Sequence, residues 1–313
     1  MAVKLIGVDI GTQGTKAALF DENGTNLAEA FRKSNLFQPE PGIVEEDPEE
    51  QLEAVCSAVK ELLDTTGTAP SDIAGIAIDG QMAGVIGVGA DGRSITPYDS
   101  WLDTRCAPYI KQMKKEAAGE ILNKTGCAPS FNHGPKILWW KNEHPDTYRN
   151  IKAFVQPGGY AAMRLCGLEG KDAFIDVSYL HFSGFADNRA SRWDEDLCRS
   201  FGVDMDKLPR ILRCDETAGK VTAEMAARTG LAEGTPVAAG CGDTAASFLS
   251  CGAVSEGICV DVAGTASVFA STASEFGADP TLTLGCSQSA VPGLWHPYAY
   301  INGGGMNLEW FRK

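Results

Sequence analysis

Asp9 and the six residues that follow Ile10 carry the first group of side chains that could do chemistry. Gly11, Thr12, Gln13, Gly14, Thr15 and Lys16 come directly after an apolar run that ends at Asp9 and Ile10. Glycines let backbone N–H groups approach a ligand, threonine hydroxyls donate to phosphate oxygens, and Lys16 supplies a positive charge. A carboxylate at Asp9 suits Mg²⁺ held through water. The segment favours a phosphate-binding turn, and the alternative is a plain hairpin turn with a solvated lysine.

Two common nucleotide motifs do not describe this turn. Gly11 and Gly14 do not form a GxGxxG pattern, and no Gly-Lys-Ser or Gly-Lys-Thr follows a four-residue gap. The segment after the turn has a strand-like pattern, whereas both motifs open a helix. The dinucleotide-binding fingerprint and the P-loop pattern therefore both fail at this segment.

Asp243 stands where an apolar strand gives way to a helix, behind Gly240 and Gly242. A carboxylate in that position can point into a cleft and take the proton from an attacking alcohol. The alternative is an N-cap for the helix expected over 244–250, a position that aspartate favours. Both roles are compatible with the pattern.

A third group of polar side chains flanks a predicted hairpin. Gln81 and Met82 precede it, and Trp101, Asp103 and Arg105 follow it. Amide, carboxylate and guanidinium groups beside an aromatic face are common in polyol pockets. The alternative is a surface pair of Asp103 and Arg105 beside a core tryptophan.

Composition limits the classes of partner. With 313 residues the chain is long enough for about two domains at roughly 150 residues each. Its formal net charge of −14 repels phosphate backbones and anionic lipids, so nucleic acid and membranes are not expected partners. The N-terminus has no secretory h-region and no apolar stretch approaches about 20 residues, which predicts a cytoplasmic protein.

The cysteines and histidines give no metal-ligand pattern. The ten cysteines include no CxxC, and their closest pair is Cys251 and Cys259. We expect reduced, mostly buried thiols. The four histidines are scattered, so no structural metal is assigned.

The sequence predicts many of the strands and helices that must position these residues. Strands are expected near 5–10, 15–20 and 26–31, then a helix that begins at Asp47-Pro48 with Glu50 closing a capping box. Strands near 73–78 and 85–88 follow, residues 107–230 are mainly helical in pattern, and a strand at 235–239 leads to Asp243. Strands are expected again over 257–262 and 266–272 around Gly264 and Thr265. Because this repeats the opening strand, Gly-Thr turn and strand, it suggests a duplicated domain with a boundary near 249–255.

Taken in order, these segments resemble the FGGY family of carbohydrate kinases, within the superfamily of actin, hexokinase and the heat-shock chaperone ATPases. Xylulose kinases are the most similar well-known branch. The resemblance implies an α/β fold of two RNase H-like domains, each a mixed sheet flanked by helices. Residues 1–250 would form the sugar-binding domain and 251–313 the beginning of an incomplete nucleotide-binding domain. The matching segments are Gly7–Lys16, Gly80–Met82, Trp101–Arg105, Pro135–Trp140, Gly240–Ala246 and Gly264–Thr265.

The resemblance also implies roles. The cofactors would be ATP and Mg²⁺ and the substrate a sugar or polyol, first of all a ketopentose such as xylulose; a homodimer is compatible with it. Asp243 would be the general base and Asp9 would position Mg²⁺ and the transferred phosphoryl group. The turn from Gly11 to Lys16 and the turn at Gly264 and Thr265 would hold the nucleotide phosphates, and Gln81, Met82, Trp101, Asp103 and Arg105 would form the sugar-binding face.

Two residues depart from the xylulose kinase pattern. Ala83 stands where that branch usually has histidine, which removes one polar contact to the sugar, and His133 replaces a smaller residue before Lys136.

Two other classes of function stay open at this stage. A non-catalytic sugar-binding module would fit an incomplete second domain. An actin-like or chaperone-like ATPase would fit the phosphate turns but would leave the residues from Gln81 to Arg105 unexplained.

Overall fold

The N-terminal hairpin forms because its residues alternate between two environments. In β1 (Lys4–Gly11) the apolar residues Ile6, Val8 and Ile10 are buried. Strand β2 (Gly14–Asp21) pairs antiparallel with β1, and β3 (Asn26–Lys33) pairs antiparallel with β2. The predicted meander is confirmed. The computed structural model describes residues 3–263, 267–301, 307 and 310–312.

These strands belong to a seven-stranded mixed sheet with the order β13-β14-β5-β1-β2-β3, in which β15 also pairs with β5. Strand β5 runs parallel to β1, β14 and β15, so the carboxyl ends of these four strands meet at one edge of the sheet. The remaining members are β5 (Ile73–Gly80), β13 (Thr217–Lys220), β14 (Pro236–Ala238) and β15 (Cys241–Gly242). This mixed sheet is the α/β arrangement expected from the resemblance.

Helix α1 (Pro48–Thr66) makes the crossover that a parallel β1–β5 pair requires. Asp47 caps it by accepting a hydrogen bond from the Glu49 backbone N–H at 2.8 Å. The predicted capping box is wrong, because Glu50 instead accepts from Asn35 Nδ2 at 3.1 Å. The buried face of α1, which includes Leu52 and Val59, packs on the sheet together with α5 (Pro157–Leu165).

The segment 107–230 contains more short strands than its pattern predicts. Besides β13, this segment contains β8 (Ala153–Val155), β9 (Phe174–Asp176), β10 (Ala186–Asp187), β11 (Arg192–Trp193) and β12 (Arg210–Leu212). They were missed because runs of two or three residues show no period-two alternation. Other helices in the described part of the chain are α2 (Ala107–Thr125), α3 (His133–Glu143), α4 (Pro145–Asn150), α6 (Glu195–Phe201), α7 (Ala223–Thr229) and α8 (Asp243–Ser250). Short 3-10 segments lie at Pro70–Asp72, Gly170–Asp172, Val177–Phe182 and Met205–Lys207. Three further strands are β4 (Glu45–Glu46), β6 (Ile86–Val88) and β7 (Tyr98–Asp99).

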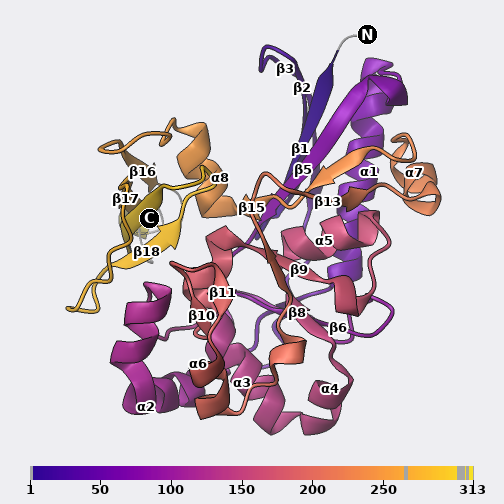
Figure 1. Cartoon of the computed structure of the whole chain (residues 1–313). Coiled ribbons are helices and arrows are strands. Elements are labelled where there is room, and N and C mark those ends of the chain that lie inside the picture. Colours follow the sequence, from indigo (N-terminus) through magenta and orange to yellow (C-terminus); the bar gives the residue numbers. More distant parts are fainter. Residues whose placement is uncertain (1–2, 264–266, 302–306, 308–309, 313) are drawn as a thin grey trace.

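A second, four-stranded antiparallel sheet follows α8. Its order is β16-β17-β19-β18, with β16 (Cys259–Ala263), β17 (Ser267–Ser271), β18 (Gly285–Gln288) and β19 (Trp295–Ile301). In Figure 1 this yellow sheet lies beside α8 and above α2, to one side of the central sheet. The predicted strands on either side of Gly264 and Thr265 are confirmed, whereas Gly264 and Thr265 themselves lie outside the described residues.

All ten cysteines are free thiols, of which Cys251 and Cys259 are exposed. Within the described residues, no helix combines the length and the apolar composition that a membrane crossing needs.

Candidate active site

Three aspartates from distant parts of the sequence meet at the carboxyl edge of the central sheet. Asp9 on β1 is the register partner of Asp79 on the parallel strand β5. Cys241 on β15 is in turn the register partner of Asp79, and Asp243 comes two residues later as the first residue of α8. Paired residues of neighbouring strands point to the same face. Asp9 and Asp79 therefore share the face opposite to that of Ile6 and Val8.

Burial and mutual repulsion raise the pKa values of this trio. Burial raises the pKa of Asp79 to about 9, and the charges of Asp9 and Asp243 act in the same direction. Burial, followed by the charge of Asp9, raises the pKa of Asp243 to about 6. The pKa of Asp9 is raised by burial, against its hydrogen bond with Asp79 and the charge of Lys16. Asp79 therefore holds a proton at neutrality, while Asp243 ionises just below it.

Asp243 is held in place at the start of α8. Its Oδ1 accepts hydrogen bonds from the Thr244 backbone N–H at 2.6 Å and from the Thr244 hydroxyl at 3.1 Å. The predicted N-cap role is not what the structure shows, since Gly242 is the N-cap residue and Asp243 is the first helical residue. The carboxylate thus sits at the positive end of an eight-residue helix with one oxygen fixed.

The predicted phosphate turn closes the β1–β2 hairpin, with Gly11 opposite Gly14. A side chain at Gly14 would place its Cβ 2.3 Å from the Arg32 carbonyl oxygen, so only glycine lets β3 approach this closely. The side chains of the turn are less available than the sequence suggests. Thr15 is 1% exposed and faces the core, and the exposed Lys16 forms an ion pair with Glu29 at 2.9 Å.

The hydroxyl of Thr12 is also engaged within the protein. It donates to Gln81 Oε1 at 3.1 Å and accepts from the Trp101 indole N–H at 2.9 Å. Because a hydroxyl has one proton, Thr12 has none left for a phosphate. Backbone N–H groups, rather than threonine hydroxyls, are what this turn can offer a phosphate.

Met82 joins the predicted sugar-binding face to Asp243. Its side chain is 9% exposed and lies against Gly242, where an added Cβ would be 2.6 Å from the methionine sulfur. The Tyr179 hydroxyl supports the same loop by donating to the Gly80 carbonyl at 3.0 Å. The next residue, Ala83, has a φ of 66°, in the left-handed region that a non-glycine residue seldom adopts. The loop is thus held in an unusual conformation beside Gly242, the residue that precedes Asp243.

Asp103 and Arg105 lie in a buried ionic cluster and not in an exposed pair. Asp103 is 0% exposed and accepts from the Val44 backbone N–H at 2.8 Å and from Arg105 Nε at 2.8 Å. Arg105 also donates to Glu45 at 2.6 Å, and its guanidinium lies 4.9 Å from the centre of the Trp139 ring. We expect these two residues to support the loop that carries Trp101 and not to contact a sugar.

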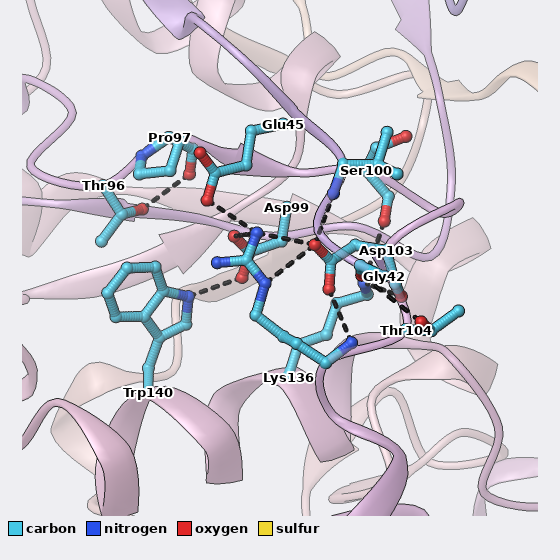
Figure 2. Close-up of polar contacts among 12 residues, drawn as sticks. Gly42, Glu45, Thr96, Pro97, Asp99, Ser100, Asp103, Thr104, Lys136 and Trp140 are labelled. Carbon is cyan, nitrogen blue, oxygen red and sulfur yellow. Dashed lines mark hydrogen bonds and ion pairs between the residues drawn. The ribbon is translucent and has the colours of Figure 1, made fainter. Parts of the chain in front are cut away.

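Helix α3 completes the cluster from below. Figure 2 shows Lys136 and Trp140 reaching from one helix toward Asp103 and Asp99. Lys136 is 1% exposed and donates to the carbonyl oxygens of Ser100 at 2.9 Å and Asp103 at 3.1 Å. The Trp140 indole N–H donates to Asp99 at 2.6 Å. Lys136 thereby fixes both ends of the loop that presents Trp101.

Comparison with known proteins decides the family. Residues 4–250 match the FGGY family of carbohydrate kinases, N-terminal domain. The chain belongs to this family. It is 27% identical to the xylulose kinase of Bacillus subtilis (strain 168) over 313 residues, which are 99% of this chain and 61% of that protein. It is 26% identical to the gluconokinase of the same organism, with coverage of 100% and 60%.

Solved structures of the family have the same fold. The xylulose kinase from Rhodospirillum rubrum superposes with a TM-score of 0.91 at 28% identity, covering 98% of this chain and 62% of that one. The Plasmodium falciparum glycerol kinase with ADP has a TM-score of 0.88 at 19% identity and supports the fold alone. The chain spans about three fifths of the length of the curated relatives named above. Membership of the FGGY family and the mixed-sheet kinase fold predicted from the sequence are confirmed.

Two residues of the site were missed by sequence reasoning. Asp79 ends an apolar strand before a glycine, as Asp9 nearly does, so the repeated strand-Asp pattern was the available signal. Glu46 is 2% exposed and accepts from Gln81 Nε2 at 2.8 Å. It stands in a run of charged residues before α1 that gave no sign of burial.

One cavity lies away from these residues. It has a volume of about 320 Å³ between residues 211–216 and 288–293, and none of the predicted site residues lines it.

Proposed function

We propose that this FGGY family member takes part in ATP-dependent phosphorylation of a sugar or polyol hydroxyl, with a ketopentose such as xylulose as the first candidate. The names of the similar proteins support this substrate class. The observation that carries the proposal is the position of Asp243. It directly follows Gly242, against which Met82 packs, and burial together with the charge of Asp9 raises its pKa to about 6.

In this proposal Asp243 is the general base. A base with a pKa just below neutrality is ionised before the reaction and still holds a proton well afterwards. Because Oδ1 is engaged by Thr244, we assign Oδ2 as the atom that takes the proton from the attacking hydroxyl. Met82 and Trp101 supply the apolar surfaces that orient the sugar, and orientation is most of what phosphoryl transfer asks of a protein.

The residues present fit Mg²⁺ and nucleotide phosphates. Asp9 Oδ1 is buried and has no hydrogen-bond partner among the described residues, which suits a hard cation that keeps most of its waters. No group of three or more histidine, cysteine or acidic side chains in the described part of the chain has the geometry of a protein-only metal cage. Asp9 would hold the ion, and the ion would neutralise charge on the transferred phosphoryl group. The backbone of the Gly11–Gly14 turn, and Gly264 and Thr265, would bind phosphates.

The test is a coupled ADP-release assay with Mg²⁺ and ATP over ketopentoses, ketohexoses, polyols and glycerol. It is run on this chain and on a longer protein that supplies the remaining length of the relatives. Turnover that depends on a sugar and disappears in Asp243→Asn supports the proposal. ATP hydrolysis that ignores the sugar would favour an ATPase, and sugar binding without turnover in either protein would favour a binding module.

A further inference from the structure

A continuous chain of hydrogen bonds connects five side chains from four segments of the sequence. The Trp101 indole N–H donates to Thr12 at 2.9 Å, Thr12 donates to Gln81 Oε1 at 3.1 Å, and Gln81 Nε2 donates to Glu46 Oε1 at 2.8 Å. Gln51 Nε2 donates to the other Glu46 oxygen at 3.0 Å. Gln81, Glu46 and Gln51 are 1%, 2% and 5% exposed.

Glu46 fixes the direction of every bond in this chain. An ionised carboxylate only accepts, so both glutamines must turn their NH₂ groups toward it. Gln81 then presents its carbonyl to Thr12, which has to donate its proton. The Thr12 oxygen is left to accept from Trp101, whose indole can only donate. Reversing the Gln81 amide would set its carbonyl against the Glu46 carboxylate, two acceptors without a proton between them, and would break the chain.

This series of hydrogen bonds connects all parts of the candidate site. Thr12 lies in the turn between Gly11 and Gly14, Trp101 lies on the loop held by Lys136, and Gln81 precedes Met82, which rests on Gly242. We propose that Glu46 is a positioning residue that, through Gln81 and Thr12, sets the orientation of the Trp101 indole in the sugar site. The expected effect on kinetics rests on the proposed function. The series of hydrogen bonds from Glu46 to Trp101, called the wiring below, does not depend on catalysis.

Two substitutions separate orientation from mere packing. Glu46→Leu keeps the approximate volume and removes the acceptor, so the Gln81 amide loses the group that orients it. Glu46→Gln can still present its carbonyl to Gln81 if Gln51 turns its own amide, and Gln51 Oε1 has no present partner to lose among the described residues. Glu50→Leu is the matched control, because Glu50 is exposed and outside the chain.

The kinetic measurement compares the change in KM for the sugar with the change in kcat, in whichever of the two proteins phosphorylates the sugar. We expect Glu46→Leu to raise KM by roughly tenfold, the size of one lost buried hydrogen bond, with a smaller change in kcat. Glu46→Gln should stay within about threefold of the parent protein, as should Glu50→Leu. Equal KM values in Glu46→Leu and the parent, or equal losses in Glu46→Leu and Glu46→Gln, would overturn the positioning role.

A second readout needs no substrate. Nitrogen-15 labelling of tryptophan gives one indole N–H signal per tryptophan, and Trp101→Phe identifies the signal of Trp101. Thr12→Val should shift that signal, Thr12→Ser should restore it, and Glu46→Leu should shift it although Glu46 does not touch Trp101. An unmoved signal in Glu46→Leu would refute the wiring even in an active enzyme. A shifted signal in a protein that neither binds nor phosphorylates any sugar would refute the proposed function and leave the wiring intact.

Discussion

Replacing Lys136 by methionine tests whether the ionic cluster under the Trp101 loop holds the site together. Lys136 is 1% exposed and donates to the Ser100 and Asp103 carbonyl oxygens. Methionine fills a similar volume but supplies neither hydrogen bond nor charge. The cluster contains Arg105 and Lys136 against Glu45, Asp99 and Asp103, so its formal charge changes from −1 to −2.

The expected cost follows from these contacts. Each hydrogen bond from a charged donor contributes about 1.5–3 kcal/mol, and losing one partner of a buried ionic group costs about 3–5 kcal/mol. Methionine also avoids the cost of burying the lysine charge, and the range of about 3–5 kcal/mol already includes this gain. We therefore expect Lys136→Met to lower the free energy of unfolding by about 3–5 kcal/mol. Because Asp99 carries part of the uncompensated charge, adding Asp99→Asn should recover about 1–3 kcal/mol of that loss.

Urea denaturation followed by circular dichroism measures these changes. Lys111→Met is the control, because Lys111 is exposed on α2 and the same substitution there should change stability by less than about 0.5 kcal/mol. A loss in Lys136→Met below about 1 kcal/mol would contradict the reasoning. So would a double variant with Asp99→Asn that is less stable than Lys136→Met alone.

The site and the sheet give three other predictions. Asp243→Asn should lower sugar phosphorylation by roughly 10²–10⁴-fold in the ADP-release assay while changing the sugar Kd little, and retained turnover would remove Asp243 from the base role. Gly14→Ala should cost about 1–3 kcal/mol in thermal or urea unfolding because of the 2.3 Å approach to the Arg32 carbonyl, whereas Gly119→Ala, which meets no neighbour within 4 Å, should not destabilise. Burial raises the pKa of Asp176 to about 7, so the folded state holds a proton that the unfolded chain releases above its ordinary pKa near 3.8, and stability should fall as pH rises from about 4 to 7. Asp176→Asn should flatten that fall between urea titrations at pH 5 and pH 8, and an unchanged slope would show that Asp176 does not cause it.

Local chemistry made much of the fold predictable. The β1–β2 hairpin and α1 follow from alternation, from the Asp47-Pro48 start and from Gly67 at the helix end, all of which act within a few residues. The same alternation also places Thr15 in phase with Ala17, facing the core, although its hydroxyl suggested a phosphate ligand. The residue type of Thr15 suggested a phosphate ligand, but the alternation of the strand decides that its side chain faces the core.

Residues that depend on distant partners were not predictable. Asp79 meets Asp9 only through the parallel register of β1 and β5, which no local pattern encodes. The spacing of Asp103 and Arg105 is equally suited to a surface pair or a polyol contact. Their burial is decided by Lys136 on α3, more than 30 residues later in the sequence.

Helix α8 joins two structural units through one rigid body. Its first residue, Asp243, comes directly after strand β15 in the central sheet, while Phe248 near its other end packs with Val260, Ala270 and Tyr298 of the second sheet. Eight helical residues span only about 12 Å and cannot bend to absorb a displacement. A rotation of the second sheet would therefore move α8 as a unit and displace Asp243, so the position of the proposed general base depends on both sheets.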